Sequence, residues 1–265
     1  FDLTLFFLFK PILGCLFLLL SLSKFFCCLV SLCFSFFFGD RETMGPYGRY
    51  MTGGFPGMTC PAKVGWFFQE LPAFLVPVLL FLTTESNPGL GRYLLGTYCL
   101  HYFQRTFIYA LLTRGRPMPV STVISAIIFC SMCGWLQAHY LLHCRQYDET
   151  WLMDIRLTAG LLIFLLGMGI NIHSDHILRN LRKSGENTYK IPRGGMFEYV
   201  SGANFFGEIL EWSGYAIATW SLPTFAFAYF TMCSIGPRAY YHHRFYIEKF
   251  SDYPKSRRAV IPFLL

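Results

Sequence analysis

Long apolar runs separated by short polar connections are the feature that most limits how this chain can fold. A bilayer crossing takes about 20 mostly apolar residues, and hydropathy picks out seven segments near that length. They are residues 12–38, 66–84, 93–112, 120–142, 156–178, 204–222 and 224–242. We therefore predict an all-α, polytopic integral membrane protein, built as a bundle of about seven transmembrane helices.

Composition excludes the main alternatives to a membrane bundle. Only 14% of the 265 residues are charged, whereas a soluble domain is about one quarter charged. Aromatic residues alone make up 19% of the chain, which excludes intrinsic disorder. Most of the ten cysteines lie inside apolar runs, where a free thiol behaves as a small hydrophobe. We interpret even the Cys130-x-x-Cys133 pair as packing, so no disulfide framework is expected.

The chain shows no internal repeat and no long linker, which favours a single domain. Residues 1–43 form an atypical N-terminal apolar segment that contains the first membrane helix. Residues 44–265 make up the remainder of one membrane-embedded domain. Because the connections are short, neighbouring helices should be antiparallel and packed as one bundle.

Basic residues are distributed unevenly over the predicted connections. Sixteen of the 22 Lys and Arg residues fall in loops 1, 3 and 5, in the C-terminal tail or at the adjoining end of the last span, against three in the other loops. Cytoplasmic loops of membrane proteins carry such an excess. The C-terminus and these three loops are therefore predicted to be cytosolic. The Arg257-Arg258 pair of the tail is suited to anionic lipid headgroups.

Five of the predicted helices carry polar stripes near their cytosolic ends. Polar groups inside a membrane usually face a cavity or a partner, and helical spacing places these on one face. The stripes are Glu70; Tyr102, Arg105 and Tyr109; Asn171, Asp175, Arg179 and Arg182; Asn204, Glu208, Glu211 and Tyr215; and Arg238, His242 and Tyr246. Interhelical hydrogen bonds explain single positions. The arginines gathered at one mouth favour a phosphate-bearing ligand, because guanidinium groups suit phosphate oxygens.

Two other ligand signals are weak. The histidines of His173-Ser174-Asp175-His176 and of His242-His243 lack the i, i+4 spacing of a helical zinc site, so no metal is expected. No glycine-rich phosphate turn follows a strand, so side chains would have to hold any nucleotide.

Several ordered motifs resemble the steroid 5α-reductase family. The similarity covers about residues 61–265, is nearer to the vertebrate type 2 isozyme, and does not extend to residues 1–43. The motifs are Phe68-Gln69-Glu70-Leu71-Pro72, His101-Tyr102-x-x-Arg105, Arg114-Gly115-Arg116-Pro117, Gly169-Ile170-Asn171-Ile172-His173-Ser174-Asp175, Ile191-Pro192-Arg193-Gly194-Gly195, Ser201-Gly202-Ala203-Asn204-Phe205-x-Gly207-Glu208, His242-His243-Arg244-Phe245-Tyr246 and Tyr253-Pro254-Lys255-Ser256-Arg257.

This resemblance implies an NADPH-dependent oxidoreductase of the endoplasmic reticulum membrane. The implied reaction is reduction of the 4,5 double bond of 3-oxo-Δ4 steroids such as testosterone and progesterone, a step of androgen biosynthesis and of steroid and lipid metabolism. Hydride would reach C5 while the catalytic residues Glu70 and Tyr102 anchor the C3 carbonyl. The steroid would enter from the bilayer. The expected partners are membrane lipids, with no nucleic acid, and the protein is expected to be a monomer.

The resemblance also implies a set of binding residues. Ser125 aligns with a basic residue of the type 2 enzyme, so the resemblance does not support one of the family's phosphate contacts at this position. Candidate walls of the steroid site are Trp66, Phe225 and Phe230. The implied cofactor-binding residues are Arg105, Tyr109, Arg116, Asn171, Asp175, Arg182, Tyr189, Asn204, Glu208, Arg238, His242 and Tyr246.

Two other functional classes stay open at this point. One is a related membrane enzyme acting on an enoyl-CoA, a polyprenol or a prenylcysteine. The other is a non-enzymatic transporter, which would be expected to show broken half-helices or internal repeats.

Overall fold

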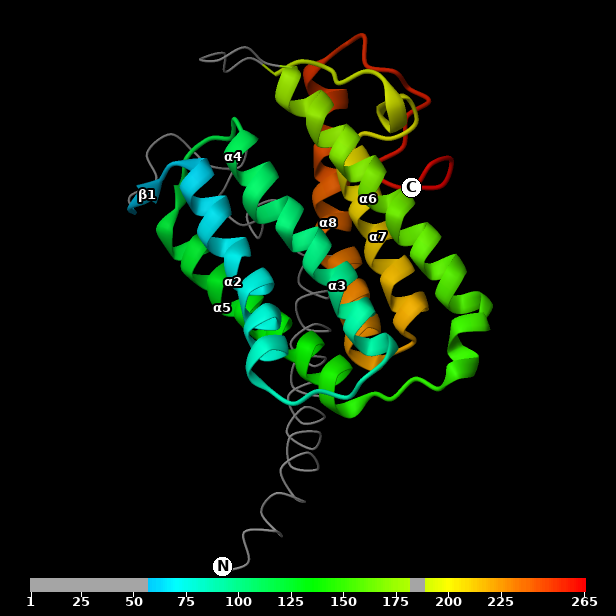
Figure 1. Ribbon diagram of the computed structural model, residues 1–265. Coiled ribbons are helices and arrows are strands. Elements are labelled where there is room, and N and C mark those ends of the chain that lie inside the picture. Colours follow the sequence, from blue (N-terminus) through cyan, green and yellow to red (C-terminus); the bar gives the residue numbers. More distant parts are fainter. Residues whose placement is uncertain (1–56, 182–188) are drawn as a thin grey trace, which may run out of the picture. The chain divides into compact units, whose positions relative to one another are not determined.

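The computed structural model describes residues 57–181 and 189–265, and these residues are mostly helical (Figure 1). The predicted all-α class is confirmed for this part of the chain. Each of the six predicted spans from residue 66 onward coincides with a helix. The first predicted span, residues 12–38, lies outside the described residues, so the count of seven spans stays a prediction.

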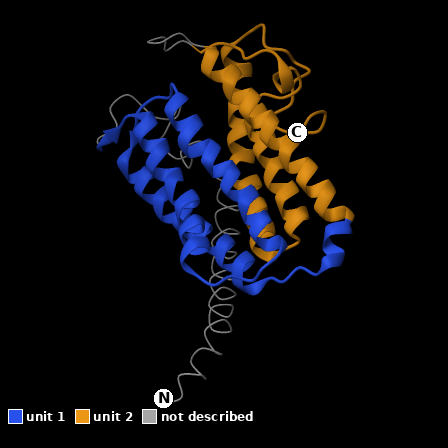
Figure 2. Ribbon diagram, viewed as in Figure 1, with its two compact units in different colours: residues 1–31, 45–154 blue, residues 32–44, 155–265 orange. Residues whose placement is uncertain are grey.

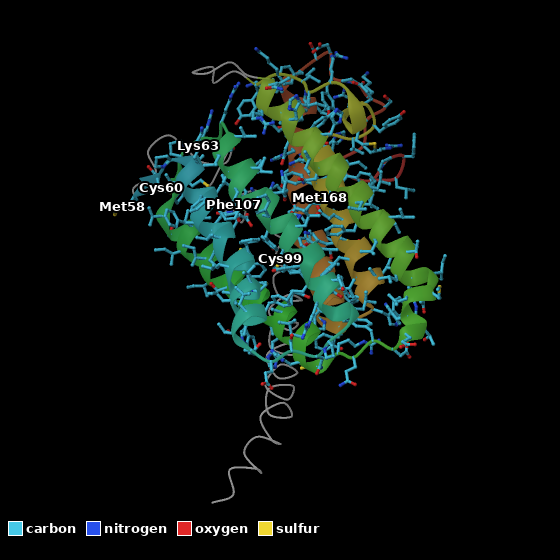
Figure 3. All side chains as sticks on the ribbon, in the orientation of Figure 1. Met58, Cys60, Lys63, Cys99, Phe107 and Met168 are labelled. Carbon is cyan, nitrogen blue, oxygen red and sulfur yellow. The ribbon has the colours of Figure 1, made fainter. Side chains whose placement is uncertain are left out.

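The chain divides into two compact units (Figure 2). The described part of unit 1 is residues 57–154, and that of unit 2 is residues 155–181 and 189–265. Side chains project from the helices of both units (Figure 3).

The described part of unit 1 has three long helical stretches and a short antiparallel pair of strands that are far apart in the sequence. Its elements are β1 (Thr59–Cys60), α2 (Ala62–Thr83), α3 (Leu90–Phe103), the π-helical segment η3 (Gln104–Tyr109), α4 (Ala110–Leu112), β2 (Met118–Pro119), α5 (Val120–His139), a second π-helical segment η4 (Tyr140–Cys144) and the 3-10 turn η5 (Glu149–Met153). β1 pairs antiparallel with β2. This pairing ties the start of α2 to the start of α5.

Helix α2 packs against α5 where one glycine meets two prolines. Pro72 and Pro77 lie inside α2, and each lacks the N–H that would continue the helix ladder. A Cβ atom added to Gly134 of α5 would lie 3.1 Å from Cδ of Pro77 and 3.2 Å from Cα of Ala73. A larger side chain would push the helices apart, so Gly134 permits their close approach.

The described part of unit 2 has three long helices and an irregular segment between the first and the second of them. Its elements are α6 (Ile155–Asn180), the 3-10 turn η6 (Gly195–Glu198), α7 (Ala203–Thr219) and α8 (Leu222–Lys249). The side chain of Ser221 caps α8 by accepting a hydrogen bond from the amide of Thr224. α8 runs seven residues beyond the span predicted from hydropathy, because its last two turns are helical but polar.

Four glycines hold α6 and α7 at backbone contact. Those on each helix are two turns apart and so share a face. A Cβ atom on the second of them, Gly167, would lie 2.3 Å from the amide nitrogen of Glu211. Small residues permit this approach of membrane helices. We call these residues the glycine seam: Gly160 and Gly167 on α6, and Gly207 and Gly214 on α7.

Three of the described helical stretches are long and apolar enough to cross a membrane. They are Ala62–Thr83, Val120–Cys144 and Ile155–Asn180. The other stretches differ in physical ways: α7 has only 17 residues, and the second half of α8 is polar. These three long apolar helices therefore support the prediction of a membrane protein.

The C-terminal tail folds back onto the segment that leads into α7. Arg258 forms a parallel bridge with Val200. The side chain of Arg257 is buried, with 1% of the residue exposed, whereas Arg258 is exposed. The prediction that the Arg257-Arg258 pair meets lipid headgroups is therefore wrong for Arg257, whose hydrogen bonds are internal.

Candidate active site

Helices α2 and α3 of unit 1 are joined by a cluster of phenylalanine rings. Phe107 of η3, labelled in Figure 3, lies at its centre. Its ring centroid is 5.4 Å from that of Phe74 and 5.2 Å from that of Phe103. The Phe74–Phe107 pair is edge to face and the Phe103–Phe107 pair is tilted; aromatic pairs at such separations stabilise a contact beyond their buried area. The packing fixes the faces of α2 and η3 that carry the polar stripes.

Glu70 lies on α2, one turn after Trp66. It is 9% exposed, and its Oε1 atom accepts a hydrogen bond of 3.1 Å from Nε2 of Gln69, which is also buried. Buried carboxyl groups require such partners, because desolvation without hydrogen bonds is costly. The sequence interpretation missed Gln69 as a partner, although it directly precedes Glu70.

Arg105 is buried between two aromatic rings. Its guanidinium carbon lies 4.1 Å from the ring centroid of Tyr109 and 5.1 Å from that of Trp66. The rings of Trp66 and Tyr109 meet edge to face at 5.2 Å. Cation–π contacts strengthen when they are desolvated, so this trio is a rigid, positively charged wall.

Tyr102 lies at the end of α3, next to that wall. Its ring is 4.7 Å from that of Tyr98 and 5.0 Å from that of His101. Glu70 on α2 and Cys130 and Cys133 on α5 lie in its neighbourhood. Helix α2 packs against both α3 and α5, and Tyr102 is buried among these helices.

The two cysteines near Tyr102 are neighbours that the sequence interpretation treated only as packing. Cys130 and Cys133 are buried on α5, and their i, i+3 spacing places them on one face. Cys130 also lies in the neighbourhood of Glu70 and Arg105. The spacing is visible in the sequence, but no local pattern indicates which helix these cysteines face.

The stripe of Tyr102, Arg105 and Tyr109 crosses from α-helix into π-helix. Arg105 and Tyr109 both belong to η3. π-Helical turns are rare and frequently occur at functional sites. A regular period of 3.6 residues, which the sequence analysis assumed, does not describe this segment.

Unit 2 brings other predicted residues together. The side-chain amide of Asn171, on α6, donates a hydrogen bond of 3.0 Å to the backbone carbonyl of Asn204, in the first turn of α7. This contact lies one turn beyond Gly167 of the seam. Asp175 is buried one turn further along α6, and Glu208 is half-buried on α7.

The polar stripe of α8 is partly engaged in aromatic contacts. The ring of His242 lies 5.3 Å from that of Phe205, and Tyr246 is buried and stacked on Tyr253 at 5.4 Å. Arg238 is half-buried on the same helix. Beside this helix, Tyr189 meets Phe245 edge to face at 5.1 Å.

The remaining predicted site residues are placed as follows. Arg116 is half-buried in the connection between α4 and β2. Phe230 is half-buried on α8, and Phe225, near the start of that helix, is 59% exposed. Ser125 donates a hydrogen bond to the carbonyl of Ser121 on α5. Arg182 lies outside the described residues.

Comparison with known proteins gives a consistent result. The family model described as 3-oxo-5-alpha-steroid 4-dehydrogenase matches residues 116–265. The chain is 54% identical over 223 residues to the 3-oxo-5-alpha-steroid 4-dehydrogenase 2 of Homo sapiens, covering 82% of this chain and 87% of that protein. It is 54% identical over 223 residues to the protein of the same name from Macaca fascicularis, with the same coverage.

Similarity to the type 1 protein is lower. The chain is 49% identical over 230 residues to the 3-oxo-5-alpha-steroid 4-dehydrogenase 1 of Macaca fascicularis, covering 85% of this chain and 87% of that protein. The predicted nearness to type 2 is therefore confirmed.

Proposed function

Because this chain belongs to the 3-oxo-5-alpha-steroid 4-dehydrogenase family, we propose that it reduces the 4,5 double bond of 3-oxo-Δ4 steroids with NADPH. The observation that carries the proposal is the buried cluster of unit 1, in which Glu70, Tyr102 and Arg105 lie on adjoining helices. A transporter or a structural bundle would not require these groups to converge.

The proposed chemistry follows from the charge that develops during the reaction. Negative charge collects on the ketone oxygen of a conjugated enone as its β-carbon is reduced. Hydrogen-bond donors already in place there lower the barrier, because they need not reorganise. The hydroxyl of Tyr102 is such a donor, and the carboxyl of Glu70 either donates to the ketone oxygen itself or holds that hydroxyl in place. The amide of Gln69 orients that carboxyl through Oε1.

Residues of the chain fit a dinucleotide phosphate. The amide of Asn171 is held in place by the carbonyl of Asn204, and the neighbouring hydroxyl of Ser174 is buried without a hydrogen-bond partner among the described atoms. A buried hydroxyl of this kind is expected where a ligand completes its contacts. The full proposed set is Arg105, Tyr109, Arg116, Asn171, Asp175, Arg182, Tyr189, Asn204, Glu208, Arg238, His242 and Tyr246.

NADPH, when bound, supplies the hydride that C5 receives. The chain's own residues bind and orient the cofactor and the steroid, and they exclude water from the site. Arginine side chains suit the pyrophosphate and the 2′-phosphate because they present paired donors. Trp66, Phe225 and Phe230 are proposed walls for the steroid, and the proton for C4 comes from solvent or from the Glu70–Tyr102 pair.

We propose seven membrane spans with a cytosolic C-terminus in the endoplasmic reticulum membrane. The positions of the described helices and the uneven distribution of basic residues support this topology. The steroid would reach the protein from the bilayer.

Matched substitutions test the carbonyl-anchor roles. Glu70→Gln and Tyr102→Phe should each lower turnover by about 100-fold or more, while the KM for NADPH changes little. The controls Glu85→Gln and Tyr93→Phe change the same groups at exposed positions of unit 1 and should keep normal turnover. Full activity of both Glu70→Gln and Tyr102→Phe would refute the assignment.

A further inference from the structure

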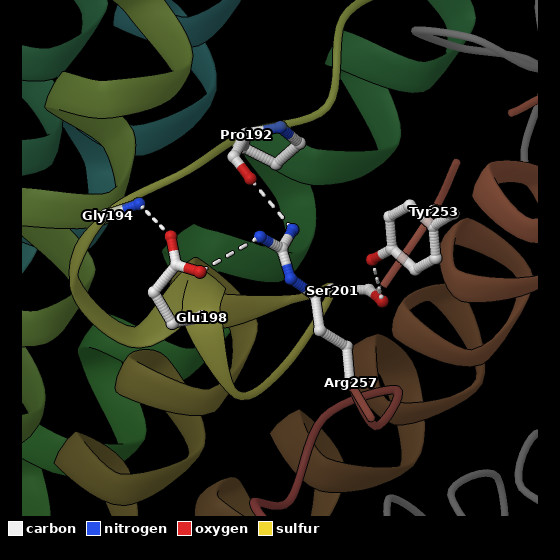
Figure 4. A network of polar contacts seen from close by, with 6 residues as sticks. All are labelled: Pro192, Gly194, Glu198, Ser201, Tyr253 and Arg257. Atoms are coloured by element: carbon white, nitrogen blue, oxygen red, sulfur yellow. Dashed lines mark hydrogen bonds and ion pairs between the residues drawn. The ribbon is translucent and has the colours of Figure 1, made fainter. Parts of the chain in front are cut away.

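A buried arginine of the C-terminal tail is tied to the turn that precedes α7 (Figure 4). Nη1 of Arg257 donates a hydrogen bond of 2.8 Å to the carbonyl of Pro192, and Nη2 lies 3.3 Å from Oε2 of Glu198. The guanidinium carbon also lies 5.5 Å from the ring centroid of Tyr253. The planar fork of arginine allows it to make these contacts at once, which a lysine could not do.

Glu198 extends this connection into the turn itself. Its Oε1 atom accepts a hydrogen bond from the amide of Gly194. Gly194 and Gly195 have φ angles of 92° and 53°, a region that favours glycine. A Cβ atom on Gly195 would lie 2.6 Å from Cε1 of His173 on α6. The turn therefore packs closely against α6 and is also connected to the tail through Glu198 and Arg257.

A second anchor lies at the entrance to α7. The hydroxyl of Ser201 lies 2.6 Å from the hydroxyl of Tyr253 and 2.6 Å from Nδ1 of His243 on α8. Two backbone bonds join the same place to the tail, from the Ser201 amide to the Arg258 carbonyl (2.8 Å) and from the Gly202 amide to the Ala259 carbonyl (2.9 Å). The first residues of α7 thus have a fixed position.

The two anchors lie between two residues, Tyr189 and Asn204, that the proposed function assigns to cofactor binding. The first begins three residues after Tyr189, and the second ends two residues before Asn204. We call Glu198, Ser201, Tyr253 and Arg257 the tail clamp, and we propose that it positions Tyr189 and Asn204 for NADPH. This inference rests on the proposed function.

Arg257 is then a positioning residue that acts on cofactor binding without touching the cofactor. A buried charge that loses its carboxylate partner is costly, so the clamp holds as a unit or opens as a unit. Opening would release the turn and the start of α7 together. A purely structural role would instead lower the amount of folded protein and alter the binding of both substrates alike.

The test compares Arg257→Met with Lys255→Met in the full-length protein. Lys255 is an exposed cation in the same tail, so its replacement controls for loss of charge. Arg257→Met should raise the KM for NADPH at least tenfold and leave the steroid KM within twofold, and Lys255→Met should change neither. Arg257→Lys should show a smaller rise than Arg257→Met, because lysine keeps the positive charge and hydrogen-bond donors but lacks the planar fork of arginine.

Hydrogen exchange of the cofactor-free protein gives a readout that does not depend on activity. Amides of Gly194, Ser201 and Gly202 should exchange faster in Arg257→Met and at the wild-type rate in Lys255→Met. Should Arg257→Met fail to fold, Glu198→Gln carries the same test with a smaller effect, since Glu198 is half exposed. Unchanged exchange, or an equal rise of both KM values, would overturn the inference. Absence of NADPH-dependent turnover in the wild type would count against the proposed function and leave the exchange result to decide the clamp.

Discussion

A methyl group added to the glycine seam should destabilise unit 2, whereas the same methyl two residues away should not. Gly167 and Gly169 both lie on α6. A Cβ atom on Gly167 would lie 2.3 Å from the amide nitrogen of Glu211 and 2.6 Å from the carbonyl oxygen of Gly207. A Cβ atom on Gly169 would meet nothing within 4 Å. The pair therefore separates close approach from helix propensity.

The expected magnitude follows from these distances. Carbon contacts are most favourable at about 3.5–4.0 Å, so α6 and α7 must part by about 1 Å to admit the methyl of Gly167→Ala. The obstructing atoms belong to the backbone and cannot rotate away. Overpacking of this kind costs about 1–3 kcal/mol. Gly169→Ala should instead gain about 0.5–1 kcal/mol from the lower flexibility of alanine in the unfolded chain.

Thermal unfolding of the two variants in the same detergent measures this difference. The summed difference of about 1.5–4 kcal/mol corresponds to a Tm gap of roughly 3–16 °C in a chain of this size. The lower Tm should belong to Gly167→Ala. Its KM for NADPH should also rise, because the Asn171–Asn204 bond lies one turn along the same contact. A Gly167→Ala variant that melts at or above the temperature of Gly169→Ala would refute the close packing of the seam.

Three further predictions concern Glu198, Asp148 and the buried Arg105. The Gly194 amide and the Arg257 guanidinium hold the pKa of Glu198 below its ordinary value. The ionised carboxylate of Glu198 therefore stabilises the fold at neutral pH, and this stabilisation is lost as the pH falls through the folded-state pKa. Below the ordinary glutamate pKa of about 4.3, the Tm of the wild type should fall more steeply than that of Glu198→Gln, and parallel curves would count against this. Asp148→Ala should cost about 1 kcal/mol in thermal unfolding, because Asp148 accepts a hydrogen bond of 3.1 Å from the Trp151 amide; an effect no larger than that of Glu149→Ala would contradict the cap. Arg105→Gln should lower steroid turnover more than Arg105→Lys does, because lysine keeps the charge over Trp66 and Tyr109, and equal losses would argue against a role for that charge.

The sequence located the described helices well, because apolar runs have a strong physical signal. The fourth predicted span begins at residue 120, where α5 begins, and the fifth begins at residue 156, one residue after the start of α6. Polar residues that continue a helix beyond its apolar run carry no such signal. α8 therefore extends to Lys249, past the predicted end of its span.

The sequence predicts which residues make up the polar stripes, but it does not predict which residues on other helices they contact. The helical period placed Asn171 and Asn204 on polar faces, and the structure joins them through one hydrogen bond. The contact depends on the glycine seam, whose seven-residue spacing is visible in the sequence. Which helix would lie against Gly167 depends on packing between segments about forty residues apart, which no local pattern encodes.

Other features could not be read from local patterns at all. The π-helical geometry of η3 breaks the regular period on which the stripe of Arg105 and Tyr109 was argued. Arg257 looked like a surface cation, since arginine is almost never fully buried unless it is paired. Its burial depends on Glu198 and Pro192, which lie far away along the chain.

Isotope transfer tests the central claim most directly. Membranes that contain the protein would receive testosterone and NADPH carrying deuterium at the transferable position of the nicotinamide ring, and the steroid products would be resolved by mass spectrometry. The account predicts a 5α-reduced 3-oxo steroid with deuterium at C5, formed by the wild type and strongly diminished in Glu70→Gln. A wild-type protein that forms no such product, or a reduced steroid without deuterium at C5, would contradict it.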